Sequence, residues 1–225
     1  MAKKIESLNL RKSEKRTVQP PSYDVYTYDE LSPEAKKKVK QTYIEHKSNM
    51  TDWFEEDCWS ILHEMFPNSK FDFQFSLSYS QGDGFNTSGT LNVNDLIDVD
   101  LSHFILKDSS IKPLADKAAT KAACEEAGIS EIKLPENRRY GYSMADSIEL
   151  TTDSGYSILD LEDSLSPEEY ACLEDLERFA RSVMTRINGE FEEDGYAFFY
   201  EPEDSEVEDW AMANGYEFME DGTKV

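Results

Sequence analysis

The sequence is poor in the residues on which many enzymes and metal sites depend. It has only 3 cysteines and 3 histidines in 225 residues. Cys58, Cys124 and Cys172 are odd in number and lie far apart without metal-type spacing, which favours reduced thiols over a disulfide framework. No phosphate loop, no Gly-x-Gly-x-x-Gly, no Gly-x-Ser-x-Gly and no two-histidine metal helix occurs. These absences predict a protein that is not an enzyme and that holds neither a metal nor a cofactor.

Long apolar runs are missing as well. No stretch of about 18 apolar residues is available to cross a bilayer, and the N-terminus has no apolar segment of the signal-peptide kind. Hydrophobic residues still make up 39% of the chain and aromatic residues 12%, enough to build a core. We therefore expect a folded protein in the cytoplasm that makes no membrane contact.

Positive charge is scarce, and this scarcity is the strongest compositional signal. The chain has 23 lysines and arginines against 47 aspartates and glutamates, a formal net charge of -24. Residues 160–225 hold 21 acidic and 4 basic residues, whereas residues 1–22 are net basic and end in prolines. Such a surface repels nucleic acid and anionic lipid, so we expect no direct binding to either and favour basic proteins as partners.

One stretch has the pattern of a β-hairpin. Over residues 71–79, Phe71, Phe73 and Phe75 begin an apolar alternation with polar neighbours, which is typical of a strand with one buried face. Gly82 and Gly84 can supply the positive backbone dihedrals of a tight reversal. The pattern predicts a hairpin over residues 71–93. A weaker alternation over residues 138–150 predicts a further strand of an antiparallel sheet.

Helical spacing and capping signals predict four helices near residues 32–47, 51–66, 112–127 and 166–189. The clearest start is Ser166, with Pro167 next and Glu169 three residues on, which is a capping box. An acidic helix start follows at residues 203–210, and residues 23–28 and 216–218 suit short strands. The sequence therefore predicts an α+β fold: a flexible basic arm over residues 1–22, and a single domain over residues 23–225 with an acidic, helical C-terminal third.

The acidic third suggests a binding surface. Its carboxylates fall on the polar faces of helices whose other faces are apolar, so a fold would hold them rigidly. A rigid array of carboxylates can imitate the charge of a nucleic acid and occupy the cationic groove of a protein that binds one. The expected partner-binding residues are Glu190, Glu192, Glu193, Asp194, Glu201, Glu203, Asp204, Glu206, Glu208 and Asp209.

Three segments of the chain form a recognisable combination: Tyr-Thr-Tyr-Asp-Glu-Leu-Ser-Pro-Glu-Ala-Lys at 26–36, Phe-Ser-Leu-Ser-Tyr-Ser-Gln-Gly-Asp-Gly at 75–84 and Ala-Asn-Gly-Tyr-Glu-Phe-Met-Glu-Asp-Gly at 213–222. Together they resemble a largely uncharacterised group of small acidic phage-encoded accessory proteins. The middle segment is the most specific. The group has no assigned catalytic residues to carry over. The resemblance implies an accessory protein in the bacterial host cytoplasm, and together with the charge it favours an inhibitor of a host defence system of CRISPR or restriction type.

Two other functions fit the same sequence. The first is a phage structural or assembly protein, oligomeric in that case, whose acidic surface only keeps it soluble. The second is a regulator that binds a ligand or metal through the Gly82 to Gly84 turn or through Asp95, Asp98 and Asp100. The last three acids lack the glycine and the terminal glutamate of a calcium-binding EF-hand loop.

Overall fold

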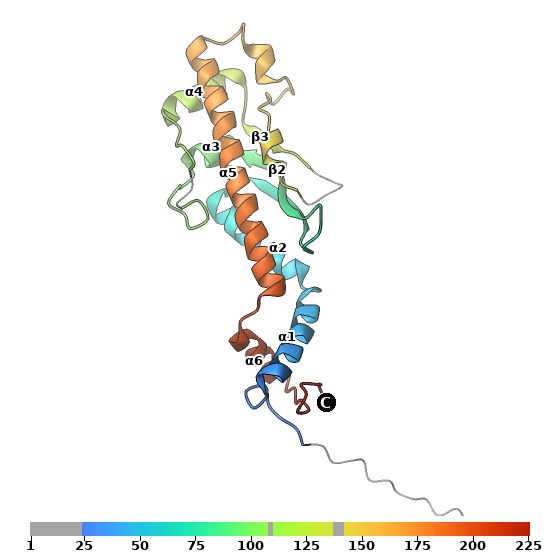
Figure 1. Ribbon diagram of the computed structural model, residues 1–225. Helices are drawn as coiled ribbons and strands as arrows, with labels where there is room; N and C mark the ends of the chain where they lie inside the picture. Colours follow the sequence, from blue (N-terminus) through green and yellow to red (C-terminus); the bar gives the residue numbers. More distant parts are fainter. Residues whose placement is uncertain (1–23, 108–109, 137–141) are drawn as a thin grey trace, which may run out of the picture. The chain divides into compact units, whose positions relative to one another are not determined.

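The computed structural model describes residues 24–107, 110–136 and 142–225. Over these residues the chain forms six α-helices and one three-stranded antiparallel sheet (Figure 1). The predicted α+β class, with helices packed on an antiparallel sheet, is therefore confirmed. The predicted basic arm lies outside the described residues. No helix within the described ranges combines the length and the apolar character needed to cross a membrane.

In chain order, the described elements are α1 (Pro33–Lys47), α2 (Thr51–Met65), β1 (Lys70–Ser76), β2 (Gly84–Asn92), α3 (Val93–Asp98), α4 (Lys117–Ala127), β3 (Glu131–Leu134), the 3-10 turns η1 (Ala145–Ser147) and η2 (Ile158–Leu161), α5 (Pro167–Tyr200) and α6 (Asp204–Ala213). The first, second and fourth predicted helices correspond to α1, α2 and α5, and the acidic helix start corresponds to α6.

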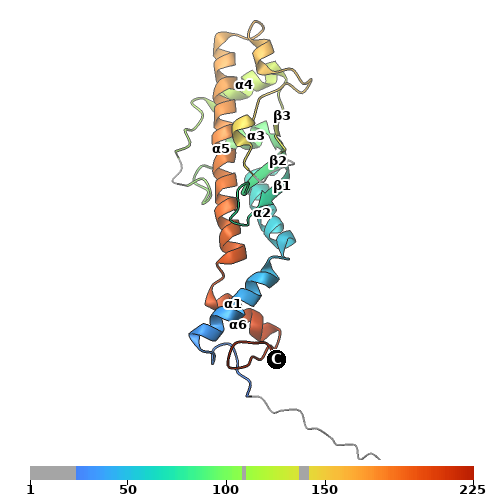
Figure 2. The ribbon, with the colours of Figure 1, turned by 45° about the vertical axis from the view of Figure 1, so that its right-hand side comes forward.

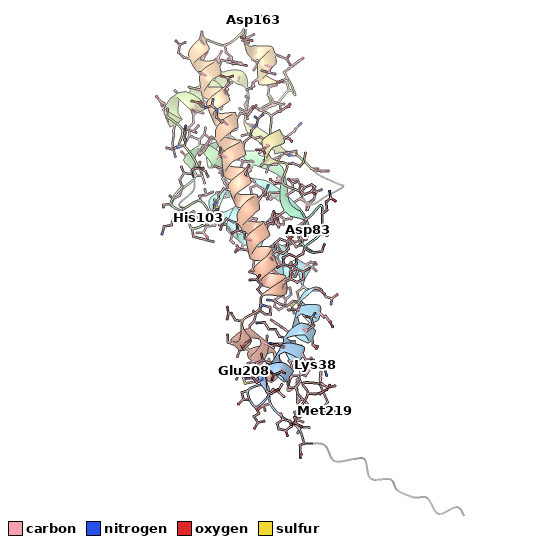
Figure 3. The ribbon with its side chains drawn as sticks, in the orientation of Figure 1. Lys38, Asp83, His103, Asp163, Glu208 and Met219 are labelled. Atoms are coloured by element: carbon pink, nitrogen blue, oxygen red, sulfur yellow. The ribbon has the colours of Figure 1, made fainter. Side chains whose placement is uncertain are left out.

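The chain divides into two compact units. Unit 1 comprises the described residues up to Val39 together with Glu208–Val225, and unit 2 comprises those within Lys40–Val207. The prediction of one domain over residues 23–225 stays a prediction. In unit 1, Tyr26 and Phe218 form an antiparallel bridge with N–O distances of 2.9 and 3.0 Å, so the two predicted short strands meet in a single bridge. Lys38 Nζ lies 2.8 Å from Asp221 Oδ2 in the same unit (Figure 3).

The sheet of unit 2 has the order β1-β2-β3. Its register pairs Phe75 with Phe85, so the aromatic residues of β1 and β2 lie side by side on one face. The rings of these two residues stack with centroids 5.5 Å apart, and Phe191 of α5 meets Phe85 edge-on at 5.3 Å. The alternation that predicted the hairpin therefore places its aromatic face against α5.

Helix α5 organises unit 2. Ser166 caps its start, with the predicted capping box to Glu169 present. Figure 2 shows α4, α3, the sheet and α2 following one another along it. The helix continues to Tyr200, past the predicted end at residue 189. It continues because Phe191 and Phe199 beyond that point are buried in the core. Asn188 is 1% exposed and is satisfied by tertiary hydrogen bonds: Thr87 N donates to its Oδ1 at 3.0 Å, and its Nδ2 donates to Ser143 Oγ at 2.9 Å.

Three predicted elements differ from the structure. The third strand is Glu131–Leu134 rather than residues 138–150; positions 137–141 are not described, and η1 occupies part of the remainder. The third helix starts at Lys117 rather than 112, because the Asp116 side chain caps it by accepting from the amides of Ala118 and Ala119. The strand predicted over residues 71–79 ends at Ser76, since the next residues form a loop around Asp83, described below.

Candidate functional site

The C-terminal half of α5 carries three adjacent carboxylates, Glu192, Glu193 and Asp194. They follow Phe191, which is buried in the core. Burial raises the pKa of Glu192, and the negative charges of Asp83 and Glu193 raise it further. Burial also raises the pKa of Asp194, with Glu193 adding to the effect. No cation of the described residues forms an ion pair with any of the three. Because successive residues of a helix lie about 100° apart, the three carboxylates face different sides of α5.

Helix α2 contributes a second group of carboxylates, which the sequence reasoning missed. Asp52, Glu55, Glu56 and Asp57 occupy its first two turns. Burial raises the pKa of Glu55, and the charges of Asp52 and of Asp72 on β1 add to the effect. The signal was visible as four acids within six residues. Only the packing of α2 on α5 brings these acids near the predicted ones.

The carboxylates at the start of α2 and at the C-terminal end of α5 that form no ion pair among the described residues make up what we call the acidic surface. They are Asp52, Glu55, Glu56 and Asp57 on α2, and Glu192, Glu193, Asp194 and Glu201 on and just after α5.

Three of the ten predicted residues are engaged within the chain. Glu190 forms an ion pair with Arg186 one turn before it on α5. Asp204 Oδ1 lies 3.5 Å from Lys40 Nζ. Glu206 accepts from the side chains of Lys47 and Tyr43. These three acids are partly neutralised and form part of the fold, so they are weaker candidates for a partner than the other seven.

The other seven predicted residues fall in different places. Glu192, Glu193, Asp194, Glu201 and Glu203 lie in unit 2, whereas Glu208 and Asp209 lie in unit 1. The set is therefore divided between the two units and does not form one continuous site.

Lys47 is the cation that the fold buries most. Its side chain is 5% exposed, and Nζ lies 2.5 Å from Glu206 Oε1 and 4.1 Å from the centroid of the Phe198 ring. Tyr43 donates its hydroxyl to the same Glu206 oxygen at 2.8 Å. Burial opposes the ionisation of Glu206, but the hydrogen bonds from Lys47 and Tyr43 outweigh it and hold the pKa of Glu206 below its usual range. This network fixes the end of α1 to the start of α6.

The Gly82 to Gly84 turn is organised by Asp83 (Figure 3). The Asp83 carboxylate accepts from the amides of Ser78 and Ser80 at 2.6 and 2.8 Å and from the Tyr196 hydroxyl at 2.9 Å. Burial alone would raise the pKa of Asp83, but these donors hold it well below its usual range. Gly82 has a φ of 106°, as the predicted reversal requires. These hydrogen bonds fold the residues after Ser76 into a loop, which explains why the strand stops early. They also occupy the carboxylate, so it has little capacity left to bind a ligand.

Asp95, Asp98 and Asp100 line one open pocket of about 480 Å³. Each has a separate structural task. Asp95 accepts from the amide and side chain of Asn68 at 2.7 and 2.8 Å, Asp98 pairs with Lys121 at 2.7 Å, and Asp100 caps the turn that follows it. Across the described ranges, no three histidine, cysteine or acidic side chains lie close enough together to hold a metal ion.

The cysteine and histidine side chains of α2 and α4 lie in environments typical of structural residues rather than of catalytic ones. Cys58 is 2% exposed, and burial raises the pKa of its thiol. Burial also raises the pKa of Cys124 to about 12. His63 is exposed and stacks on Trp59 with centroids 4.8 Å apart. Cys58 is therefore a core thiol and His63 an exposed imidazole, and a buried neutral thiol is a poor nucleophile.

Comparison of the chain with known protein families, with curated proteins and with solved structures found no match.

Proposed function

We propose that this protein is a non-enzymatic phage accessory protein that binds a basic host protein through its acidic surface. The partner is a nucleic-acid-directed defence protein, of CRISPR or restriction type, in the cytoplasm of the bacterial host. The observation that carries the proposal is the group of adjacent, unpaired carboxylates Glu192, Glu193 and Asp194, two of which have raised pKa values. Burial is the main cause of both shifts and repulsion by neighbouring carboxylates adds to it, so a cationic partner that binds here stabilises the ionised carboxylates.

The dimensions of the acidic surface suit a partner that otherwise holds nucleic acid. Glu192 and Glu201 are nine positions apart, roughly 14 Å at about 1.5 Å per helical residue. One strand of duplex DNA places about four phosphates along that length, at roughly 3.4 Å each. Four predicted acids, Glu192, Glu193, Asp194 and Glu201, occupy the same length of chain, at different angles round the helix axis. The α2 acids widen the array beyond a single row.

The fold holds this charge in place before binding. Helix α5 is anchored from within by Phe191 and Phe199, both buried. The α2 acids precede and follow Phe54, which meets Phe199 at 5.4 Å. Because both acidic faces are supported by one aromatic core, little ordering entropy is lost when a partner binds.

The first experiment is retention of host proteins on the immobilised protein at low and at high salt, with the retained proteins identified by mass spectrometry. We expect a basic nucleic-acid-binding protein that is lost as salt rises, and whose purified form is displaced by duplex DNA. Retention of phage structural proteins alone would instead favour the assembly function.

Charge-reversed variants test which carboxylates bind the partner. The test variant changes Glu192, Glu193, Asp194 and Glu201 to lysine. The matched control changes Asp160, Glu162, Asp163 and Glu174, all exposed in unit 2, and alters the net charge equally. We expect the test variant to lose the partner and the control to keep it, with circular dichroism unchanged in both. Equal binding by both variants would contradict the proposal, and equal loss would show that only overall charge matters.

A further inference from the structure

A pocket of about 370 Å³ opens between α2 and α5 within unit 2. Its apolar lining includes Phe54 and Ile61 from α2 and Phe191 and Phe198 from α5. Ligand pockets span roughly 300–1,000 Å³, so this one suits a single side chain or a similarly small group.

Helical spacing explains why the pocket forms here. Phe54, Cys58 and Ile61 recur every three or four residues on α2, and Phe191, Asp194 and Phe198 do so on α5. Gly195 lets the two helices approach closely, because a Cβ there would lie 2.3 Å from Leu77 Cδ1 and 3.0 Å from Phe54 Cζ. The pocket lies beside this close contact, since Phe54 also lines it.

The pocket combines an apolar lining with uncompensated negative charge. Asp57 and Asp194 also line it, and no lysine or arginine does. Burial raises the pKa of Asp194, as expected for a carboxylate that has no cation beside it. Lys47 lies over the Phe198 ring, but Glu206 neutralises it at 2.5 Å. The site therefore offers aromatic and aliphatic surface next to two carboxylates.

An exposed tryptophan adjoins the pocket. Trp53 precedes Asp57 by one helical turn and is 66% exposed. Tryptophan and arginine are the residues most enriched at the energetic centres of protein interfaces. A large exposed ring beside an acidic pocket is therefore a suitable contact for a basic partner.

We propose that the pocket binds one arginine side chain of a protein partner. The stem packs on Ile61 and Phe198, and the guanidinium is held by the carboxylates of Asp57 and Asp194. Arginine fits better than lysine because its planar guanidinium is weakly hydrated, stacks on aromatic rings and donates two parallel hydrogen bonds to a carboxylate. This inference rests on the proposed function and names the partner's chemistry at one point of the acidic surface.

The isolated protein permits a direct test with butylguanidinium, which reproduces the arginine stem and head. Methyl NMR of Ile61 is expected to show a saturable shift in the millimolar range. Guanidinium without a stem and butanol without a charge are each expected to bind at least about fivefold more weakly. No saturable shift, or an equal response to butanol, would overturn the inference.

Two variants that each remove the charge of one pocket carboxylate, and one matched control, test whether these carboxylates bind the guanidinium. Asp57→Asn and Asp194→Asn are each expected to weaken butylguanidinium binding about threefold to tenfold, since each removes one ionic hydrogen bond. Glu56→Gln removes the neighbouring exposed charge outside the pocket lining and is expected to have little effect. Unchanged affinity in both asparagine variants would overturn the proposed role of the carboxylates.

The outcomes separate this inference from the proposed function. If the intact protein retains a basic host partner that the double variant Asp57→Asn, Asp194→Asn binds equally well, the arginine pocket is wrong while the acidic surface stands. If butylguanidinium binds as expected but no basic partner is retained, the proposed function fails, and with it the assignment of the pocket to a partner's arginine. Retention that falls about tenfold in the double variant but not in Glu56→Gln supports both.

Discussion

Removal of the Glu206 carboxylate tests the buried network around Lys47. In Glu206→Ala the Lys47 ammonium keeps its place on the Phe198 ring but loses its ionic partner. Breaking a fully buried ion pair costs about 3–5 kcal/mol, but the Glu206 side chain is 40% exposed, and water relieves part of this cost. A hydrogen bond to a charged group contributes about 1.5–3 kcal/mol. We therefore expect the free energy of unfolding to fall by about 2 kcal/mol.

The assay is urea denaturation of a double-mutant cycle. Lys47→Met removes the buried charge and preserves the apolar stem, so Glu206→Ala is expected to cost much less in its presence. The coupling energy is expected to be about 1–2 kcal/mol. Asp209→Ala, an exposed acid on the same helix, serves as the control and is expected to stay within about 0.5 kcal/mol of the wild type.

The pH dependence of the coupling has a definite sign. The pKa of Glu206 is lowered in the folded protein, so its contribution is present above the ordinary carboxyl pKa of about 4.3. It is lost as the pH falls through the folded value. A coupling below about 0.5 kcal/mol at pH 7, or one that grows in acid, would refute the reasoning.

Three further predictions concern unit 2. Asp83→Ala is expected to speed the amide hydrogen exchange of the loop over residues 77–83 about tenfold, because its carboxylate holds that loop closed; unchanged exchange would contradict this role. Asn188→Leu is expected to lower the free energy of unfolding by about 1–3 kcal/mol, because it leaves the buried amide of Thr87 without an acceptor. Urea denaturation measures this change. An unchanged free energy of unfolding would mean that a water molecule or a backbone shift gives the Thr87 amide another acceptor. The pKa values of Glu192 and Asp194 are raised, so both acids destabilise the fold while ionised, and stability is expected to rise as the pH falls from 7 through their folded pKa values towards the unfolded value near 4. Thermal melts from pH 7 to pH 5 measure this change in stability. The double variant Glu192→Gln, Asp194→Asn is expected to show a smaller increase in melting temperature than the wild type. An equal increase in both proteins would contradict the prediction.

Local sequence signals determined most of the helices and the hairpin. The capping box at Ser166 and Glu169 specifies the start of α5 through contacts three residues apart, and such contacts can be read directly from the sequence. The alternation of Phe71, Phe73 and Phe75 specifies which face of β1 is apolar, because side chains alternate across a strand.

Elements controlled by distant partners were decided only by the tertiary structure. Asn188 is buried in the core and satisfied by Thr87 and Ser143, which are remote in sequence. Asp83, by contrast, accepts from the amides of Ser78 and Ser80, five and three residues before it, so this part of its loop is local. Its contact with the Tyr196 hydroxyl is the one that depends on the tertiary structure.

The candidate site divides in the same way. The sequence by itself determined that the protein is acidic and that its negative charge is concentrated towards the C-terminus, and it predicts basic partners. Tertiary packing decided which carboxylates are available, because Glu206 and Glu190 are taken up by Lys47 and Arg186 while Asp194 is left without a cation. It also placed α2 on α5 and so formed the pocket, since a pocket between two helices depends on side chains that are distant in sequence and come together only when the core packs.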